Sequence, residues 1–197
     1  MSETIVTRPA RKSDASDVAL LINVATHGGV ARGWAADDEA GEAYDPAEIG
    51  RLEVLKDDDT FNWRNATIAE GEGGEIAGML LGYREPEQSK PLASDTPAFM
   101  VPILELEGAA AGHWFVSMLG VHIRWRSKGI GSKLLGVAAD KAGATAAKGL
   151  ALIVEDVNAG ARRLYERHGF SVRTSRPMVR FPGSTGDGRD WLLMVKD

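Results

Sequence analysis

The amino-acid sequence predicts an α/β protein in which strands and amphipathic helices follow one another along the chain. The clearest sign is a strand, a helix and a strand in succession, at Trp114 to Ile123, Gly131 to Lys148 and Leu150 to Glu155. A second sign is the pair of segments Thr67 to Glu70 and Ile76 to Tyr83, whose glycine-rich connection is typical of an antiparallel hairpin. At 197 residues, the chain has the size of one domain with one core.

A strand and a helix are expected near the N-terminal end. Thr4 to Thr7 alternates as a short strand does, and Ser13 or Asp14 can cap the helix that follows. Apolar residues recur at helical spacing in this helix, at Val18, Leu21, Ile22 and Ala25. The segment from His27 to Gly41 contains glycines and small residues and is interpreted as a candidate lid, before Pro46 opens a weaker helical pattern.

Four prolines interrupt the stretch between Arg84 and Gly112, which favours a loop over any long element. Within this stretch, Ile103 to Glu107 alternates apolar and acidic residues, which predicts a short edge strand. On such a strand Glu105 and Glu107 would lie on the same face, because side chains alternate with a period of two.

The C-terminal part is expected to hold one more helix and two strands. Asn158 can cap a helix that stops at Gly169. Phe170 to Arg173 and Trp191 to Lys196 follow strand patterns on either side of a Gly183 to Gly188 turn. Since no repeat or linker is evident, a single domain spanning residues 1–197 is expected.

Composition excludes several classes of function. The formal net charge is -5 and no block of Lys and Arg is present, so a nucleic-acid partner is not expected. The chain has no cysteine, which excludes disulfides, thiolate zinc sites and a Cys nucleophile. The first residues lack an apolar signal-peptide core, and no apolar run of about 18 residues occurs. A soluble cytoplasmic protein without a membrane partner is therefore the expectation.

The turn Arg126-Ser127-Lys128-Gly129-Ile130-Gly131 carries the clearest chemical signal. It lies between a predicted strand and an amphipathic helix, where backbone N–H groups and the helix dipole favour an anion. Its two glycines allow the backbone to approach a pyrophosphate, and its Arg and Lys add positive charge. A plain glycine turn with solvated basic residues is the alternative. A dinucleotide-binding βαβ unit is disfavoured, since Leu134 stands where that motif needs a small residue.

Two segments resemble the motifs of the GNAT acetyltransferases. One is LGVHIRWRSKGIG, Leu119 to Gly131, which is similar to that family's strand followed by R/Q-x-x-G-x-G/A. The other is NAGARRLYERHGF, Asn158 to Phe170, which is similar to N-x-x-A-x-x-L-Y-x-x-x-G-F. With the helix and strand between them, the resemblance covers Trp114 to Phe170. It implies a GNAT fold, a mixed and mostly antiparallel sheet with helices on both faces, that binds acetyl-CoA.

The resemblance also implies roles for individual residues. The pyrophosphate of acetyl-CoA would be held by the residues of the turn, Arg126, Ser127, Lys128, Gly129, Ile130, Gly131 and Ser132. Backbone groups near Leu119 and Val121 would pair with the pantetheine arm and polarise the acetyl carbonyl. Asn158 would bond the same arm, and Tyr165 would protonate the departing thiolate. The spacing of these two residues, about two helical turns, puts both on one helix face. Considered alone, they would be a helix cap and a buried aromatic residue.

Direct transfer also needs a general base, because only a neutral amine attacks a thioester. Glu105 and Glu107 precede the motif-bearing strand and are the candidates, with an exposed and charged sheet edge as the alternative. The three consecutive acids Asp57 to Asp59 are interpreted as a solvated turn and not as a metal site. No catalytic role is assigned to the histidines, which are His27, His113, His122 and His168.

The predicted reaction is transfer of the acetyl group of acetyl-CoA to a primary amine, on a small molecule or a protein, by direct attack in a ternary complex. No metal is expected. The acceptor would enter past His27 to Trp34 and Arg84 to Glu107, which are the segments least like the family. A non-catalytic acyl-CoA-binding sensor with the same fold is the alternative, and it would bind without releasing thiol. Many relatives pair as dimers, so a homodimer is a family-level expectation.

Overall fold

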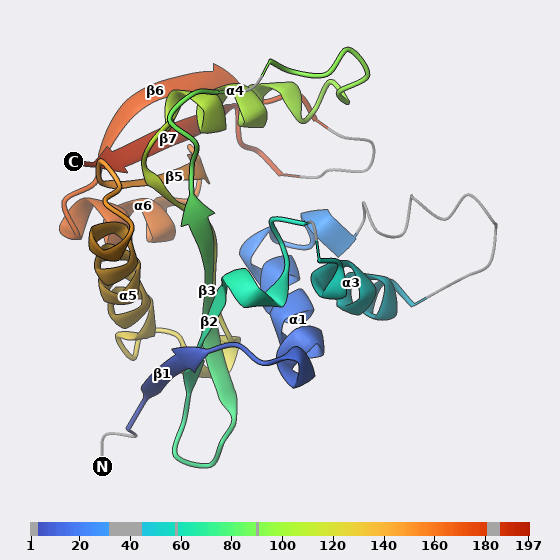
Figure 1. Ribbon diagram of the computed structural model, residues 1–197, viewed down its shortest axis with the longest axis vertical. Helices are drawn as coiled ribbons and strands as arrows, with labels where there is room; N and C mark the ends of the chain where they lie inside the picture. The colour runs from blue at the N-terminus through green and yellow to red at the C-terminus, as the bar shows by residue number, and fades with distance from the viewer. Residues whose placement is uncertain (1–3, 32–44, 58, 90, 181–185) are drawn as a thin grey trace. The chain divides into compact units, whose positions relative to one another are not determined.

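The computed structural model describes residues 4–31, 45–57, 59–89, 91–180 and 186–197 (Figure 1). Most of the candidate lid from His27 to Gly41, and residues 183–185 of the expected Gly183 to Gly188 turn, lie outside the described residues. No helix in the described ranges is long and apolar enough to cross a membrane.

Seven strands form one sheet in the order β1-β2-β3-β4-β5-β7-β6. The β4–β5 pair is parallel, whereas β1–β2, β2–β3, β5–β7 and β6–β7 are antiparallel. The predicted mixed and mostly antiparallel sheet is therefore confirmed. The strands are β1 Val6–Pro9, β2 Ala66–Glu70, β3 Ile76–Arg84, β4 Trp114–Val121, β5 Leu150–Glu155, β6 Ser171–Pro177 and β7 Asp190–Lys196.

The helices begin where the sequence places start signals. Asp14 is the N-cap of the first α-helix, Pro46 opens the next one, and the Asn158 side chain caps the last. The α-helices are α1 Ala15–Ala25, α3 Pro46–Leu55, α4 Val101–Ala109, α5 Ile130–Ala144 and α6 Ala159–Arg167. Three 3₁₀-helices accompany them, η1 Lys12–Asp14, η2 Trp63–Asn65 and η3 Ile123–Trp125, all within the described residues.

The chain divides into two compact units. The first comprises Met1–Gly82 and Met118–Leu135, and the second comprises Tyr83–Ser117 and Gly136–Asp197. The strands β3 and β4 and the helix α5 therefore each contribute residues to both units.

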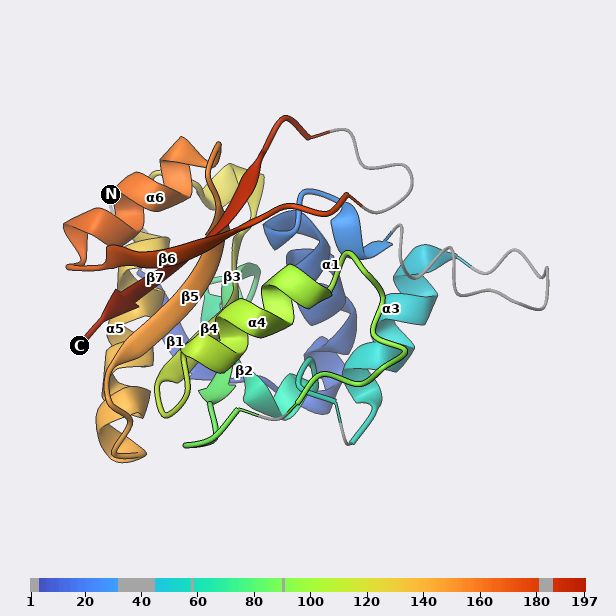
Figure 2. The same cartoon turned by 90° about the horizontal axis from the view of Figure 1, so that it is seen from above.

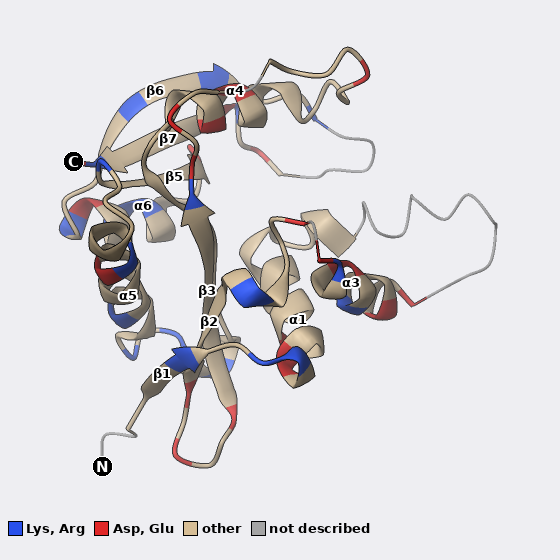
Figure 3. Ribbon diagram, in the orientation of Figure 1, with Lys and Arg blue, Asp and Glu red and all other residues tan. Residues whose placement is uncertain are grey.

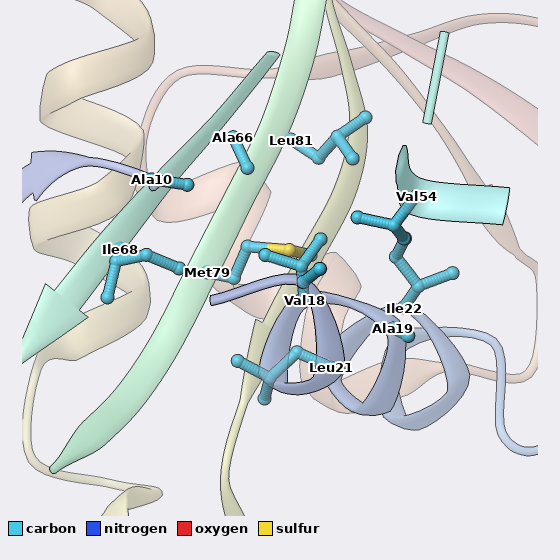
Figure 4. Close-up of a cluster of buried hydrophobic side chains, with 11 residues drawn as sticks. Ala10, Val18, Ala19, Leu21, Ile22, Val54, Ala66, Ile68, Met79 and Leu81 are labelled. Atoms are coloured by element: carbon cyan, nitrogen blue, oxygen red, sulfur yellow. The ribbon is translucent and has the colours of Figure 1, made fainter. Parts of the chain in front are cut away.

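The core of the first unit forms where α1 packs on β2 and β3 (Figure 4). Val18 and Ile22 of α1 and Ile68 and Met79 of the strands are fully buried there. These residues occur at helical spacing in α1 and on one face of each strand, so a single apolar surface is removed from water. Gly120 allows α1 to approach β4, since an added Cβ would lie 2.6 Å from the Leu21 carbonyl oxygen.

In the second unit α4 packs on β5, β6 and β7 (Figure 2). The expectation of a short edge strand at Ile103 to Glu107 is wrong, because this segment belongs to α4. Pro102 stands in the first turn, where its missing N–H costs no helical hydrogen bond. The helix buries Leu106 and Ala110, four residues apart, against Phe115 and other apolar residues of the second unit. The segment forms a helix because its buried residues are spaced four apart, although its local alternation of apolar and acidic residues also fits a strand.

Candidate active site

The turn before α5 has the backbone shape of an anion cradle. Ser127 and Gly129 both adopt positive φ angles, 62° and 79°, between η3 and the first residue of α5. The first helical hydrogen bond runs from Lys133 N to Gly129 O at 3.0 Å, so the amides of Ile130 and Gly131 precede it. Such amides need an acceptor outside the helix, and alternating φ signs turn successive N–H groups toward one point. The turn can therefore bind a pyrophosphate.

Positive charge and open space accompany this turn. Arg126 and Lys128 are exposed, and Arg126 Nε donates to Val121 O at 3.3 Å. The Lys128 ammonium lies 4.5 Å from the ring centre of Trp125, which is buried beneath the turn. A Cβ added at Gly129 would meet no atom within 4 Å, so the backbone is open to a ligand on that side. These features agree with a phosphate-bearing ligand.

The strand β4 carries the backbone groups predicted to meet the pantetheine arm. In the first unit, its C-terminal end lies against β3, since His122 N donates to Ala77 O at 2.9 Å. In the second unit, its pairs with β5 run from Trp114 to Val116 in the described part of the chain. Leu119 and Val121 lie beyond the last of these pairs, and both are partly exposed.

Asn158 and Tyr165 occupy the first and last turns of α6. The Asn158 Oδ1 atom accepts a hydrogen bond from Ala161 N at 3.1 Å, so the side chain is a helix cap and its amide Nδ2 is left to donate. Tyr165 is 8% exposed and packs against Phe170, with 5.8 Å between ring centres. Burial raises the pKa of Tyr165 to about 12, which keeps the phenol protonated. Within the described ranges, its hydroxyl has no hydrogen-bond partner.

The two candidate bases have different surroundings on α4. Glu105 is exposed and its Oε2 accepts from Arg176 Nε of β6 at 2.6 Å. Figure 3 shows acidic residues on α4 and basic residues on β6. Glu107 is half-buried, and burial together with the charge of Glu85 raises its pKa to about 7. A carboxyl group with this pKa suits a general base at neutral pH.

Glu85 is a charged residue of this region that the sequence analysis did not single out. It lies just after β3, and burial raises the pKa of its side chain. Its proximity to Glu107 arises from the fold, because the two residues are far apart in sequence and no motif links them. One feature of the sequence could have drawn attention to Glu85: it is an acid that directly follows an apolar strand and precedes Pro86.

The acids of the triplet and the histidines were not expected to bind a metal. Asp58 lies outside the described residues, while Asp57 pairs with Arg64 and Asp59 accepts from Phe61 N. Across the described ranges, no group of three or more His, Asp or Glu side chains is arranged to hold a metal ion. His113 is buried and contacts Asp197 as part of the packing of the second unit.

Comparisons with known proteins identify the family of the chain. The model of the acetyltransferase (GNAT) family matches residues 30–170. The chain therefore belongs to the GNAT acetyltransferase family, whose general activity is acetyl transfer with acetyl-CoA. The resemblance seen in the two sequence motifs is confirmed. No curated protein sequence matches the chain.

Solved structures share the fold at low sequence identity. A crystal structure of an acetyltransferase is 22% identical over 98% of each chain, with a TM-score of 0.64. An N-acetyltransferase from Staphylococcus aureus Mu50 is 16% identical over 97% of this chain and 100% of its own, with a TM-score of 0.64. The NatC complex bound to Gag peptide and CoA contains a chain that is 19% identical over 97% of this chain and 96% of its own, with a TM-score of 0.56.

Proposed function

We propose that the protein is an acetyl-CoA-dependent N-acetyltransferase that acetylates a primary amine, on a small molecule or a protein, in a ternary complex. The observation that carries the proposal is the turn from Arg126 to Ser132, whose positive φ angles and helix N-terminus form a cradle for a pyrophosphate. Acetyl-CoA supplies the thioester carbonyl that the amine attacks. The protein's own residues bind and orient the two substrates and transfer protons to and from them.

Backbone groups of β4 and the side chain of Asn158 would hold the arm of the cosubstrate. In the first unit, Leu119 and Val121 are partly exposed on β4, which supports a role for their backbone groups in binding. A backbone N–H there would donate to the acetyl carbonyl and stabilise the developing oxyanion. In the second unit, Asn158 would use Nδ2, since its Oδ1 already accepts from Ala161 N.

Proton transfers would be divided between Glu107 and Tyr165. Glu107 takes a proton from the acceptor ammonium, because its raised pKa of about 7 leaves it both ionised and basic near neutrality. Tyr165 donates a hydrogen bond, and then a proton, to the departing thiolate. Its raised pKa, which keeps the phenol protonated, supports this role. Glu105 is the weaker candidate base, because it already forms an ion pair with Arg176.

Thermal unfolding with acetyl-CoA tests the binding half of the proposal. A ligand at 100 times its Kd adds about 2.7 kcal/mol to the free energy of unfolding, so the melting temperature should rise measurably. Arg126→Glu should remove this shift. Lys12→Glu is the matched control, because it reverses the same charge on exposed η1 and should keep the shift. Absence of any shift in the wild-type protein at saturating acetyl-CoA would refute the cradle.

Thiol release tests the transfer half. The protein is given acetyl-CoA and a panel of primary amines and amino-terminal peptides, and free CoA is measured with a thiol reagent. Release that depends on the amine supports the enzyme, whereas binding without release from any member of a broad panel favours the acyl-CoA sensor. The cytoplasmic location, the homodimer and the single domain over residues 1–197 stay predictions.

A further inference from the structure

The segments that carry Glu85 and Glu107 are joined by a short chain of backbone hydrogen bonds. Glu85 N donates to His113 O at 2.8 Å. His113 N in turn donates to Ala110 O, and Ala110 N to Glu107 O, both at 2.9 Å. The His113 ring adds a bond from Nδ1 to Ala110 O at 3.0 Å. The end of α4 and the end of β3 are therefore fixed against one another through the turn of residues 110–113.

The turn is itself anchored on its other side. His113 is 4% exposed, and its Nε2 atom lies 3.2 Å from Asp197 Oδ1. Arg173 donates to both carboxylate oxygens of Asp197, at 2.8 and 2.7 Å. A second backbone bond, from Gly112 N to Pro86 O at 2.9 Å, holds the residue after Glu85. These contacts leave the Glu85 backbone little freedom to move away from α4.

Among the described residues, the cations near these two acids pair with other acids. Arg84 pairs with Glu87, and Lys148 pairs with the same carboxylate at 3.0 Å. On the β6 side of α4, Arg176 pairs with Glu105. In the part of the chain that the structure describes, neither Glu85 nor Glu107 forms an ion pair or a side-chain hydrogen bond. Glu107 therefore has Glu85 as a charged neighbour, and no cation among the described residues pairs with either carboxylate.

We propose that Glu85 is a positioning residue for the transfer reaction, whose negative charge is held beside Glu107 by the hydrogen bonds of residues 110–113 and helps Glu107 to act as a base for an ammonium acceptor. The inference rests on the proposed function of Glu107. In the step, one N–H bond of the acceptor ammonium breaks and its proton forms an O–H bond with the Glu107 carboxylate, leaving a neutral amine. Glu85 stays ionised and keeps one negative charge beside the cationic acceptor. The site would thus favour acceptors that arrive as ammonium ions.

Physical chemistry gives the direction of the coupling. Burial is the first cause of the raised pKa of Glu107, and the charge of Glu85 is the second. Two like charges in a partly desolvated place interact more strongly than in water, so removing one eases ionisation of the other.

Carbon-13 NMR of the glutamate side-chain carboxyl groups tests the coupling without any acceptor. Titration of the full chain should show a resonance with a midpoint near 7, which the Glu107→Gln variant assigns by its loss. In Glu85→Gln this midpoint should fall by on the order of half a pH unit or more. Asp140→Asn is the control, because it removes one negative charge from an exposed position on α5 of the second unit and should leave the midpoint in place.

Charge and shape are separated by a second variant. Glu85→Asp keeps the charge on a shorter side chain, so its midpoint should stay above that of Glu85→Gln. The proposal is overturned if Glu85→Gln leaves the Glu107 midpoint unmoved, if Asp140→Asn lowers it as much, or if Glu85→Asp and Glu85→Gln give the same value. Failure of the proposed function gives a different result, since Glu107→Gln would then keep full amine-dependent thiol release whatever the NMR midpoints are.

Discussion

Glu105 and Glu107 stand two residues apart on α4 and meet different environments: Glu105 pairs with Arg176 at 2.6 Å, while Glu107 is half-buried beside the charge of Glu85. Residues two apart on an α-helix point about 200° apart, because each residue turns the helix by about 100°. The same two residues on a strand would share a face. The helical conformation therefore places Glu107 beside Glu85 and turns Glu105 toward Arg176.

The first prediction compares these two acids as matched variants. Glu107→Gln should lower kcat for amine-dependent thiol release by roughly 10²- to 10⁴-fold, the contribution of a general base. Glu105→Gln should change it by only a few-fold, since it removes an exposed ion pair. Steady-state kinetics at pH 8 measure both. Equal losses in the two variants would show that neither acts as the base.

The second prediction concerns the pH dependence of catalysis. The ionised form of Glu107 is the base, so kcat/KM should fall about tenfold per pH unit below its pKa of about 7 and level off above it. Profiles recorded from pH 5 to 9 with one active amine give the midpoint, after correction for the ionisation of that amine. If kcat/KM of the wild-type protein did not fall below pH 7, Glu107 would not be the general base.

A third prediction follows from linkage between ionisation and folding. The pKa of Glu107 is raised from 4.5 to about 7 in the folded protein, so the protonated carboxyl favours folding. That contribution is fully present below pH 4.5 and is lost as the pH rises to about 7. The wild-type protein should therefore lose roughly 2 kcal/mol more than Glu107→Gln over this range. Urea unfolding of both proteins at several pH values provides the measurement, and parallel curves would count against a raised pKa.

The fourth prediction tests the glycine of the cradle. Gly129 has a φ of 79°, so Gly129→Ala should destabilise the fold by about 1 kcal/mol and weaken acetyl-CoA binding, because its Cβ enters the open side of the turn. Gly136 lies in α5 with no atom within 4 Å of an added Cβ. Gly136→Ala should stabilise the protein by about 0.5 to 1 kcal/mol and leave binding unchanged. Isothermal titration measures the acetyl-CoA affinity of both variants, and thermal unfolding measures their stability. A loss of affinity in Gly129→Ala but not in Gly136→Ala would support the role of Gly129 in the cradle.

The fifth prediction concerns Tyr165. Removal of its hydroxyl in Tyr165→Phe leaves the ring contact with Phe170 in place, so stability should change by no more than about 1 kcal/mol. The kcat should fall by about 10²-fold with little change in KM for acetyl-CoA, because the hydroxyl acts on the departing thiolate. Retention of full kcat in a folded variant would remove Tyr165 from the mechanism.

Much of the fold could be predicted because strong local signals coincide with it. Asn158 is the cap that the sequence predicts, β5 has the predicted bounds Leu150–Glu155, and Pro46 opens α3. Boundaries shifted where local signals are weak: β1 begins at Val6, and α5 ends at Ala144 before Lys148. Such shifts are ordinary because helix and strand ends fray.

The α4 region could not be predicted from its local pattern. Five residues that alternate apolar and acidic fit a strand, and they also fit a helix whose buried positions are four apart. The helix is adopted because it lets Leu106 and Ala110 pack together against Phe115 within the second unit. The role inferred for Glu85 was equally hidden, because it depends on hydrogen bonds that join distant parts of the sequence through His113.

The division of the chain into two units has a practical consequence for dissecting the protein. Each unit is built from two separate stretches of sequence, and the chain passes between the units at residues 82–83, 117–118 and 135–136. Those passages fall within β3, β4 and α5. No single cut can release either unit as an intact fragment, and each cut at a passage would sever hydrogen bonds of a strand or helix. Fragment complementation or circular permutation should therefore use the β2–β3 hairpin turn, whose exposed glycines Gly73 and Gly74 lie outside any strand.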